Sequence, residues 1–377
     1  MSTTARRTLA GFLILLSALA LVGCGSSRGP IVCAEMGCCG ASDACPVIEH
    51  LVTTHASGQV SAFTVNPATG YLGTPVITTT GGPTAGLGVS VLSNTYIYAS
   101  DFSNASIDGW FLNPGTGSLA PIPGSPFSLG PLSVGAGMAV NDLTQIVYVA
   151  DAGKIDVFKA DSSGALSAIA GSPVSSGTNL FLTIDTNGQF LFAADDDPPG
   201  GILAFTLDST TGLPTAVAGS PFAAVPGSSV NTHPGQIAVD TSGSFVYTAL
   251  NATNQVAAFS IVKPAGTLTA LPGSPFPAGT GPVALIVAGN FLYVSNTDGT
   301  ISGYKIDSTT GVLTALTGSP FAIRAGSFAT NLFGSVLYAT GAGGIQAFNI
   351  DSTTGALTAI AGSPFPDPGA ALLAFMP

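Results

Sequence analysis

Two side chains of types used in hydrolytic chemistry stand out because the sequence has so few like them. Beyond residue 47 there is a single arginine, Arg324, and there are three histidines, His50, His55 and His233. His233 precedes Pro234 and could serve as a general base, but such a base needs a cation that orients the electrophile, and only Arg324 is available among arginines. His233 and Arg324 are therefore the candidate catalytic residues. The alternative is a purely structural histidine at a turn.

A second group of polar side chains recurs at one position of a repeated pattern. Each ends or follows a short run of apolar and aromatic residues, and the group comprises His55, Asp101, Asp151, Asp195 and Asn296. If these runs are neighbouring strands, their ends form a ring on one face that could bind a cation or a polar ligand. The alternative is that each side chain caps its own loop by bonding nearby backbone amides.

Three consecutive carboxylates form a candidate metal site. Asp195, Asp196 and Asp197 offer the hard oxygen ligands that calcium prefers, but they lack the alternating spacing of a dedicated calcium loop, and two prolines follow directly. The sequence has no G-x-S-x-G nucleophile elbow, phosphate-binding loop or histidine-rich zinc motif. We therefore expect no cofactor, with calcium at the three aspartates as the alternative.

The first 23 residues have the pattern of a secretory signal peptide. Arg6 and Arg7 precede an apolar segment, residues 9–22, that is too short to span a bilayer securely, and Leu-Val-Gly-Cys at 21–24 resembles a bacterial lipobox. The pattern predicts cleavage and lipidation of Cys24, with residues 24–47 as a tether. Acyl chains would hold the protein at a membrane of the cell envelope, on the periplasmic or extracellular side. Ordinary secretion with an incidental cysteine is the alternative.

The tether contains four more cysteines, Cys33, Cys38, Cys39 and Cys45, and none follows them. Outside the cytoplasm an even set of this kind favours disulfides. Adjacent cysteines lie about 3.8 Å apart at Cα, below the roughly 4.4 Å of a relaxed bridge, so Cys33 pairs with Cys38 or Cys39 and Cys45 with the other. A thiolate metal site, for which the paired C-x2-C arms typical of zinc are missing, and free or intermolecular thiols are the alternatives.

The charge of the chain excludes one class of partner. Acidic residues number 19 against 8 basic ones, the net charge is −11, and charged residues make up only 7% of the sequence. Nucleic-acid binding needs clustered lysine and arginine side chains that neutralise phosphates. We therefore expect no nucleic-acid partner. The expected partners are the membrane, through the lipid, and an unknown protein, polysaccharide or small-molecule ligand.

One motif recurs along residues 48–377 and predicts the architecture. The pattern Gly-Ser-Pro-Phe, or a variant of it, occurs at intervals of 44–54 residues around Pro75, Pro126, Pro173, Pro221, Pro275, Pro320 and Pro364. Each repeat contains four short runs rich in β-branched and aromatic residues, separated by turn residues. Seven such units predict an all-β, seven-bladed β-propeller with four-stranded antiparallel blades.

The turns and the chain ends have specific expected roles. Residues 208–212, 307–311 and 351–355 repeat Asp-Ser-Thr-Thr-Gly, in which the aspartate bonds a nearby amide and the glycine adopts a positive φ. Their repetition indicates that these carboxylates are structural. The propeller begins with a second strand at Leu51 and ends with an inner-strand pattern at 370–375, so the last segment should complete the first blade and remove the open edge.

Three tetrapeptides carry a family resemblance. Tyr-Val-Ala-Asp at 148–151, Tyr-Val-Ser-Asn at 293–296 and Tyr-Ala-Ser-Asp at 98–101, together with G-x-I-x-x-F and D-S-T-T-G-x-L-T patterns, resemble the YVTN-type propellers. They are also similar to the seven-bladed lactonase family that includes 6-phosphogluconolactonase. The resemblance covers about residues 48–377. It implies a propeller whose catalytic members use histidine, glutamate and arginine side chains near the channel mouth.

Two functions remain as expectations. The sequence contains no complete catalytic constellation, which favours an envelope-anchored binding or scaffold propeller without evident catalysis. The alternative is a lactonase-like hydrolase that acts on a lactone or a sugar-derived ester at the channel mouth, with His233 and Arg324 at its centre.

Overall fold

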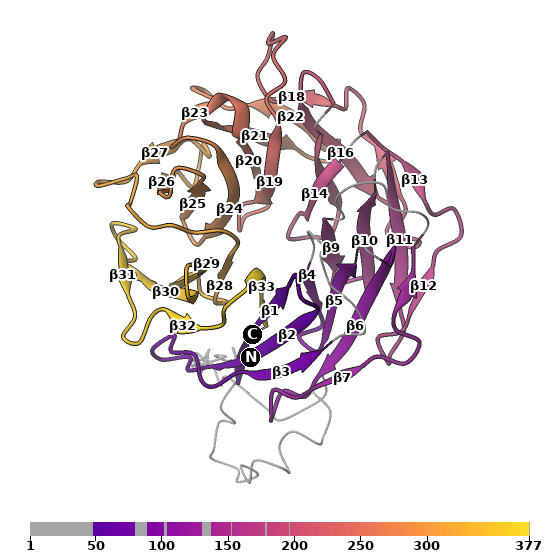
Figure 1. The fold of residues 1–377 in the computed structure, drawn as a ribbon. Helices are drawn as coiled ribbons and strands as arrows, with labels where there is room; N and C mark the ends of the chain where they lie inside the picture. Colours follow the sequence, from indigo (N-terminus) through magenta and orange to yellow (C-terminus); the bar gives the residue numbers. More distant parts are fainter. Residues whose placement is uncertain are drawn as a thin grey trace, which may run out of the picture. The chain divides into compact units, whose positions relative to one another are not determined.

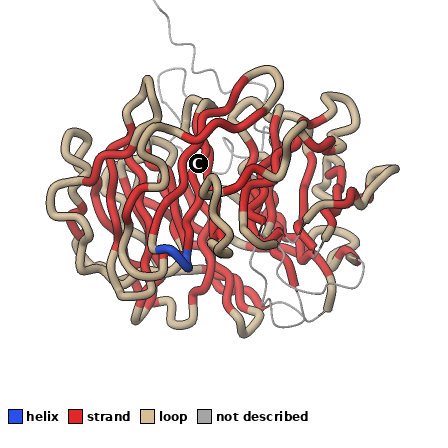
Figure 2. Tube along the Cα trace, turned by 90° about the horizontal axis from the view of Figure 1, so that it is seen from above, coloured by secondary structure: helices blue, strands red, loops and turns tan. Residues whose placement is uncertain are grey.

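Short strands separated by tight turns form nearly all of the regular structure. The computed structural model describes residues 48–79, 89–101, 104–129, 137–151, 153–177, 179–195 and 197–376. Within these residues seven antiparallel sheets surround a central axis, and the helical element is one 3-10 turn, η1 (Asn251–Thr253) (Figure 1). Seen from above, the strands of neighbouring sheets stand side by side and loops join their ends (Figure 2). The prediction of an all-β, seven-bladed propeller is confirmed.

Each blade has an inner, a second, a third and an outer strand, counted from the axis. In this order the first three blades are β33 (Ala370–Met376), β1 (Glu49–His55), β2 (Gln59–Val65), β3 (Val76–Thr79); β4 (Val89–Leu92), β5 (Tyr96–Asp101), β6 (Ser106–Leu112), β7 (Leu119–Pro121); and β9 (Met138–Asn141), β10 (Ile146–Asp151), β11 (Lys154–Ala160), β12 (Leu166–Ala168). The next two are β14 (Asn179–Ile184), β15 (Phe190–Asp195), β16 (Gly201–Leu207), β17 (Pro214–Ala216); and β19 (Pro234–Val239), β20 (Phe245–Leu250), β21 (Gln255–Val262), β22 (Thr267–Ala270). The last two are β24 (Pro282–Ala288), β25 (Phe291–Asn296), β26 (Ile301–Ile306), β27 (Leu313–Ala315); and β28 (Phe328–Thr330), β29 (Val336–Gly341), β30 (Gly344–Ile350), β31 (Leu357–Ala359).

Five blades carry a further two-residue strand that was not expected. These strands are β8 (Phe127–Ser128), β13 (Val174–Ser175), β18 (Phe222–Ala223), β23 (Phe276–Pro277) and β32 (Phe365–Pro366), and each pairs with the third strand of its own blade. They come directly after the Gly-Ser-Pro motif. The motif therefore turns the chain back along its blade before it crosses to the next one.

The last strand closes the ring, as the sequence predicts. β33 pairs antiparallel with β1, opposing Phe375 to Leu51 and Leu372 to Thr54. The chain ends thus share one sheet, and the inner strand of the first blade comes from the C-terminal segment (Figure 1). This pairing removes the open edge of the first blade.

The apolar core lies between blades. The buried residues of the described chain form seven clusters, and each joins the facing sides of two neighbouring blades. Phe127 from a Gly-Ser-Pro-Phe motif, for example, packs with Tyr98 of its own blade and Val147 of the next. No blade can bury both faces alone, so stacking around the ring supplies the hydrophobic stabilisation.

The serine of the motif has a structural task as well. The Ser125 hydroxyl oxygen accepts a hydrogen bond from the Gly109 amide at 2.9 Å, and Ser274 accepts one from Ala258 at the same distance. The same bond recurs at Ser172, Ser220, Ser319 and Ser363. The serine therefore satisfies a third-strand amide where the short outer strand has ended.

Buried tyrosines on the second strands of five blades tie each of these blades to the next one. The hydroxyl of Tyr293 donates to the Gly355 carbonyl at 2.7 Å, across an interface where the tyrosine is fully buried. Equivalent bonds join Tyr98 to Gly164, Tyr148 to Gly212, Tyr247 to Gly311 and Tyr338 to Gly70. The glycine in each pair ends a turn between the third and outer strands. The tyrosine of the YVTN-type motif and the glycine of the Asp-Ser-Thr-Thr-Gly turn are thus partners.

Replacing Tyr293 with phenylalanine is expected to lower the free energy of unfolding by about 1–2 kcal/mol. The ring still fills its place, but the buried Gly355 carbonyl loses its donor. Urea denaturation of the purified protein measures the change. Tyr71→Phe is the matched control because Tyr71 is 49% exposed, and it should be close to neutral. Equal stability of the Tyr293 variant and the wild type would contradict this role.

The repeated aspartate turns are structural, as expected. Asp208 Oδ1 accepts bonds from the amides of Thr210 and Thr211 at 3.0 and 2.7 Å, and Asp307 and Asp351 repeat this arrangement. These hydrogen bonds hold the pKa of the three carboxyl groups below its usual range. All three lie at the exposed rim of their turns.

Glu49 starts the second strand of the first blade and is only 3% exposed. Its Oε2 atom has no hydrogen-bond partner among the described residues. Burial raises the pKa of Glu49, so the folded protein binds a proton at this carboxyl more tightly than the unfolded chain. Stability from this group is therefore complete below the unfolded pKa and is lost as the pH rises through the folded pKa.

The substitution Glu49→Gln is expected to stabilise the protein near neutral pH by about 1 kcal/mol, because it removes the cost of a buried carboxylate. The gain should disappear in acid, where the wild-type carboxyl is itself neutral. Denaturation midpoints of both proteins at pH 4 and pH 7.5 measure this. A difference that does not depend on pH would show that Glu49 is not charged in the folded protein at neutral pH.

The predictions for the N-terminal segment lie outside the described residues. They are the signal peptide over 1–23, the tether over 24–47, lipidation of Cys24 and the disulfides of Cys33, Cys38, Cys39 and Cys45. Among the helices that the structure describes, none has the length and apolar character needed to cross a membrane.

Candidate functional site at the mouth face

One face of the propeller collects most of the candidate residues. At this face the chain runs into the inner strands and the second strands turn into the third; we call it the mouth face. Each predicted ring residue ends a second strand there: His55 on β1, Asp101 on β5, Asp151 on β10, Asp195 on β15 and Asn296 on β25. All five side chains are buried, with exposures between 1% and 4%. The ring therefore lies beneath the loops and does not line an open mouth.

Several ring members bond to their own loops. The Asn104 side-chain amide donates to Asp101 Oδ2 at 2.7 Å, and the Asp197 backbone amide donates to Asp195 Oδ1 at 3.2 Å. The Asn296 side-chain amide donates to the Thr300 hydroxyl at 3.0 Å. These contacts match the loop-capping alternative of the sequence prediction.

The third blade holds a charged cluster at this face. Lys154 Nζ lies 2.8 Å from Asp151 Oδ2 and 3.9 Å from Asp156 Oδ2, and the two aspartates are 1% and 7% exposed. Hydrogen bonding to Asp151 is the main cause that raises the pKa of Lys154. Two buried carboxylates thus neutralise this lysine, which leaves it little attraction for an anionic ligand.

Asp108 on β6 is the titratable group whose pKa moves furthest toward neutrality among the acids here. Its own burial, and then the neighbouring Asp101 carboxylate, raise the pKa of Asp108 to about 6. A carboxyl with this pKa can exchange a proton near physiological pH. The charged neighbour that contributes to this shift is another acid, Asp101.

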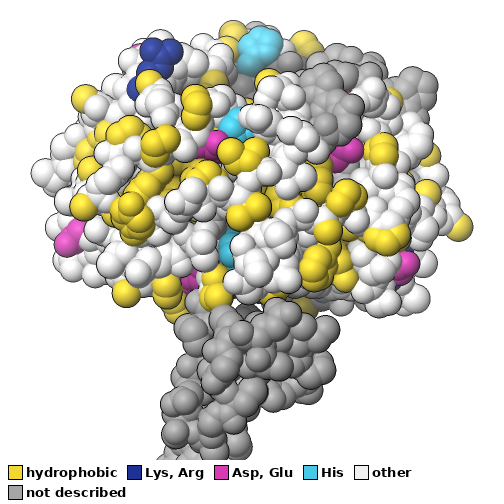
Figure 3. Space-filling model, turned by 60° about the horizontal axis from the view of Figure 1, so that its bottom comes forward, with side chains coloured by type: hydrophobic (Ala, Val, Ile, Leu, Met, Phe, Trp, Pro, Cys, Tyr) yellow, Lys and Arg dark blue, Asp and Glu magenta, His cyan; other side chains and the backbone are white. Residues whose placement is uncertain are grey.

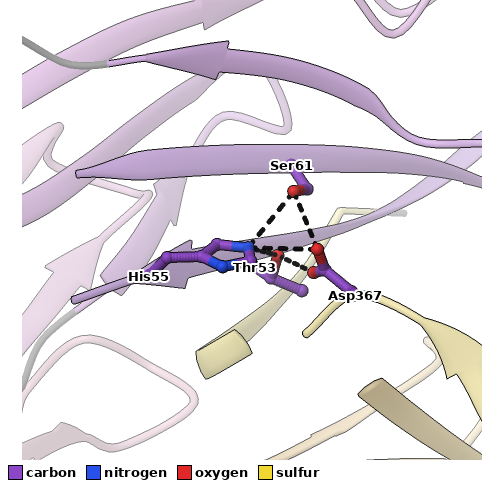
Figure 4. Close-up of polar contacts among 4 residues, drawn as sticks. All are labelled: Thr53, His55, Ser61 and Asp367. Carbon is purple, nitrogen blue, oxygen red and sulfur yellow. Dashed lines mark hydrogen bonds and ion pairs between the residues drawn. The ribbon is translucent and has the colours of Figure 1, made fainter. Parts of the chain in front are cut away.

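His55 is part of a buried polar cluster that joins the two ends of the chain (Figure 4). Its Nε2 atom lies 3.1 Å from Asp367 Oδ1, 3.2 Å from the Thr53 hydroxyl and 3.2 Å from the Ser61 hydroxyl. Thr53 donates to Asp367 Oδ2 at 2.6 Å, and Ser61 donates to Asp367 Oδ1 at 3.1 Å. Asp367 belongs to the loop that leads into β33, whereas the other three residues lie on β1 and β2.

This cluster has the residue types of a serine hydrolase triad but not its geometry. In a triad, one imidazole nitrogen binds the carboxylate and the other faces the serine. Here the same nitrogen of His55 contacts both groups, and Ser61 itself donates to the carboxylate. No side chain of the cluster is more than 4% exposed. The cluster therefore fastens the closing strand and has no access to a substrate.

His233 lies in a different setting, at the rim of a cavity. The cavity has a volume of about 460 Å³ and is lined by Phe181, His233, Pro234, Gly235, Asn251, Pro282 and Val283. These residues come from the inner-strand starts of three consecutive blades and from the turn after β20. A narrower channel of about 80 Å³ shares Phe181 with the cavity and runs between the inner strands past Gln236 and Leu373.

The backbone at His233 is unusual. Its φ is +45°, in the left-handed region that residues with a side chain rarely adopt, and a proline follows it. Asn231 Oδ1 accepts a hydrogen bond from the His233 amide at 3.0 Å, and the His233 carbonyl accepts one from the Asn251 amide at 3.2 Å. Strained backbone that its surroundings hold in place is typical of functional sites. Of the three histidines, His50 and His55 are buried and His233 is exposed.

Arg324 is not brought to this cavity. It is exposed, precedes β28 at the mouth face, and is absent from the residues that line the cavity. Its carbonyl accepts a hydrogen bond from the Gln346 side chain at 2.7 Å. The structure therefore separates the predicted base from the predicted cation. The loop of His233 leads into the fifth blade, and the loop of Arg324 leads into the seventh.

The structure describes only part of the aspartate run. Asp195 is buried, Asp197 is exposed and Asp196 lies outside the described residues. Among described residues, no group of three or more histidine, cysteine, aspartate or glutamate side chains is arranged to hold a metal ion. The expected absence of a cofactor, and calcium at Asp195, Asp196 and Asp197 as its alternative, both stay untested.

The sequence reasoning did not find several residues that matter here. Phe181 and Val283 line the cavity, and Thr53 and Ser61 complete the cluster around His55. Thr53 and Ser61 face each other in the first blade, where the second blade has Ala99 and Asp108 in the same strand register. This departure from the repeat is the signal that could have pointed to the two residues. Phe181 and Val283 carried none, since both occur in ordinary inner-strand patterns.

Comparison with known proteins identifies the family. Residues 143–261 and 220–330 match the family described as lactonase, 7-bladed β-propeller. The propeller belongs to the lactonase family. No curated protein matches the chain in sequence.

Solved structures show the same fold as this lactonase-family propeller. A protein from Bacteroides uniformis, provisionally assigned as a 6-phosphogluconolactonase, is 20% identical with a TM-score of 0.70, covering 87% of this chain and 99% of its own. A protein of the same assignment from Bacteroides fragilis is 19% identical, with a TM-score of 0.70 and coverages of 89% and 100%. The periplasmic gluconolactonase of Pseudomonas aeruginosa is 16% identical, with a TM-score of 0.67 and coverages of 88% and 99%.

The family match corrects one expectation. A binding or scaffold propeller without evident catalysis was the favoured function, and this prediction was wrong, because the chain matches a family of lactonases. The scarcity of histidine and arginine had suggested the absence of catalysis. That inference failed because a hydrolytic site needs few such residues. One exposed histidine at a cavity rim is enough to supply a general base.

Proposed function

We propose that this protein is a lactonase-like hydrolase that opens a lactone or a sugar-derived ester in the mouth-face cavity. The observation that carries the proposal is the position of His233. It is exposed on the rim of a 460 Å³ cavity, and its backbone is held in a left-handed conformation. Volumes of this size and mostly apolar linings with a few polar groups are typical of small-molecule sites. The membership in the lactonase family supports the same reaction class.

The reaction needs one base and a means to position the carbonyl. His233, as the neutral imidazole, takes a proton from a water molecule while the water oxygen attacks the lactone carbonyl carbon. The resulting tetrahedral intermediate expels the ring oxygen, and the proton passes to that oxygen, giving a hydroxyl group and a carboxylic acid. Asn251 also lines the cavity. Its side-chain nitrogen donates one N–H to the Pro282 carbonyl at 3.4 Å and has a second N–H that can be directed toward the lactone carbonyl oxygen.

Hydrolysis itself is the direct test. A pH-stat follows proton release from a panel of five- and six-membered lactones, with the purified protein lacking residues 1–23 and with the uncatalysed rate subtracted. We expect a protein-dependent rate with at least one lactone of the panel. A panel in which every lactone opens only at its uncatalysed rate would overturn the proposal.

A second proposal concerns where the protein acts. We propose that lipid on Cys24 anchors it to an envelope membrane, on the periplasmic or extracellular side, because the apolar segment and the lipobox precede a propeller poor in charge. The substitution Cys24→Ala is expected to move the protein from the membrane fraction to the soluble fraction of expressing cells. Immunoblots of the two fractions measure this, and an unchanged membrane share would refute the anchor.

A further inference from the structure

The cavity at the mouth face has an uncharged wall. None of its seven lining residues is a lysine, an arginine, an aspartate or a glutamate. Its polar side chains are those of His233 and Asn251, and the remaining lining is apolar or glycine. A ligand that enters this cavity therefore meets hydrogen-bonding groups and apolar surface but no countercharge.

The cations of the propeller lie where they cannot neutralise an anionic ligand in the cavity. Beyond residue 47 they are Lys154, Lys159, Lys263, Lys305 and Arg324. Lys154 is paired with two buried aspartates, with its Nζ 2.8 Å from Asp151 Oδ2. Lys159 donates to the Thr144 carbonyl in a turn at the opposite face, and Lys263 lies in a turn at that face too. Lys305 opposes Phe291 at the same end of its sheet, and Arg324 does not line the cavity.

The surface as a whole adds to this effect. The chain carries a net charge of −11, and one side of the molecule shows few charged side chains among uncharged polar and hydrophobic ones (Figure 3). A phosphate group of charge near −2 would be repelled at long range, and inside the cavity it would lose water without gaining a cation. An uncharged polyol is not repelled at long range, and it has no ionic hydration to lose in the cavity.

Phe181 gives the cavity an apolar platform. It lies on β14 and lines both the cavity and the narrower channel below, so its ring forms part of the boundary between them. The C–H face of a sugar ring is apolar, and an aromatic side chain offers a flat surface of matching size for it. His233 lines the same cavity as Phe181, so a ligand placed against the ring shares the cavity with the proposed base.

We propose that the cavity takes an uncharged sugar lactone, packed against Phe181, and discriminates against a phosphorylated one. This inference rests on the proposed hydrolase function and narrows its substrate class.

Selectivity of the protein lacking residues 1–23 is the primary test. kcat/KM is measured for glucono-1,5-lactone and for its 6-phosphate under the same conditions, and binding of both is measured by calorimetry. We expect the unphosphorylated lactone to be preferred by about tenfold or more. Equal or reversed preference overturns the inference and leaves the hydrolase function standing. Binding of the neutral lactone in preference to its phosphate, but without turnover, would refute the hydrolase function and support the inference. If the neutral lactone does not bind, the inference is overturned.

A matched pair of lysine variants tests the electrostatic reason. Val283 is 37% exposed in the cavity lining, and Val262 is 46% exposed at the opposite face, so Val283→Lys and Val262→Lys add the same charge at different places. Val283→Lys is expected to shift the preference toward the phosphorylated lactone by about tenfold, the effect of one charge-assisted hydrogen bond, whereas Val262→Lys leaves it unchanged. Equal shifts in both variants, or none in Val283→Lys, would contradict the placement of the substrate.

The role of Phe181 has its own readout. Phe181→Leu retains an apolar side chain but removes the flat ring, so we expect KM for the neutral lactone to rise by about tenfold with kcat nearly unchanged. An unchanged KM would remove Phe181 from the substrate contact. A fall in kcat alone would point to a disturbed channel and equally contradict the platform.

Discussion

Asparagine in place of His233 is expected to lower kcat/KM for lactone hydrolysis by about 10²- to 10⁴-fold, the usual contribution of a general base. Asparagine is among the residues that tolerate a positive φ, so the substitution keeps the backbone conformation at 233 and removes only the base. Alanine would confound the two effects, because it is less tolerant of that conformation. Steady-state kinetics of the wild type and the variant, at matched thermal stability, measure the loss.

Arg324→Ala serves as the comparison. Arg324 is exposed and does not line the cavity, so its removal should change kcat/KM by no more than about twofold. A His233 variant with full activity would rule out the base proposed here. A large loss in the Arg324 variant would restore the pair of base and cation that the sequence suggested, and would show that the two loops approach each other when substrate is bound.

Alanine at Asp367 is expected to destabilise the protein by about 3 kcal/mol or more. Three buried groups direct hydrogen bonds or close contacts to this carboxylate: the hydroxyls of Thr53 and Ser61, and His55 Nε2. Removing the acceptor leaves buried donors without a partner, each of which costs about 1–3 kcal/mol. The loss falls on the pairing of β33 with β1, which closes the propeller. Equilibrium denaturation in urea measures the change.

The control for this prediction is Asp351→Ala. Asp351 also accepts three hydrogen bonds, but it does so in an exposed turn where water can replace it. Its loss should cost less than about 1 kcal/mol. Similar effects of the two substitutions would show that the cluster around His55 contributes no more than a surface turn. A large effect confined to Asp367 would establish that the cluster holds the ring closed.

The architecture could be predicted from sequence because it is encoded locally and repeatedly. Each Gly-Ser-Pro-Phe motif and each Asp-Ser-Thr-Thr-Gly turn is fixed by nearby residues, and seven copies at a steady interval leave few other folds. Closure by the last strand followed from the order of strand patterns at the two ends. The common position of His55, Asp101 and the other ring residues followed from the same register.

The site was harder to predict because it depends on contacts between distant segments. His55 and Asp367 come from segments far apart in the sequence, and only the structure shows that they meet and are buried. The cavity around His233 combines residues of three blades, and Phe181 has no sequence feature that separates it from other inner-strand residues. The buried state of the ring was also not predictable, since burial depends on how loops of neighbouring blades cover the strand ends.

Two of the seven interfaces lack the tyrosine bond, and this has a consequence for motion. Between the first and second blades Val52 occupies the tyrosine position, and His50 Nε2 donates to the Pro114 carbonyl there instead, at 3.0 Å. On the second strand of the fourth blade, Phe192 stands where five other blades have a tyrosine, so no hydroxyl reaches the turn of the fifth blade. The fourth and fifth blades also supply Phe181 and His233 to the cavity. Apolar packing, which has no fixed direction, joins the strands of these two blades, and the Thr232 amide adds a hydrogen bond to the Pro199 carbonyl at 3.1 Å in the mouth-face loops. Small sliding between the strands is therefore easier than at the tyrosine-bonded joints. Breathing of the propeller should concentrate at this seam, where it would widen the passage through which a ligand arrives and leaves.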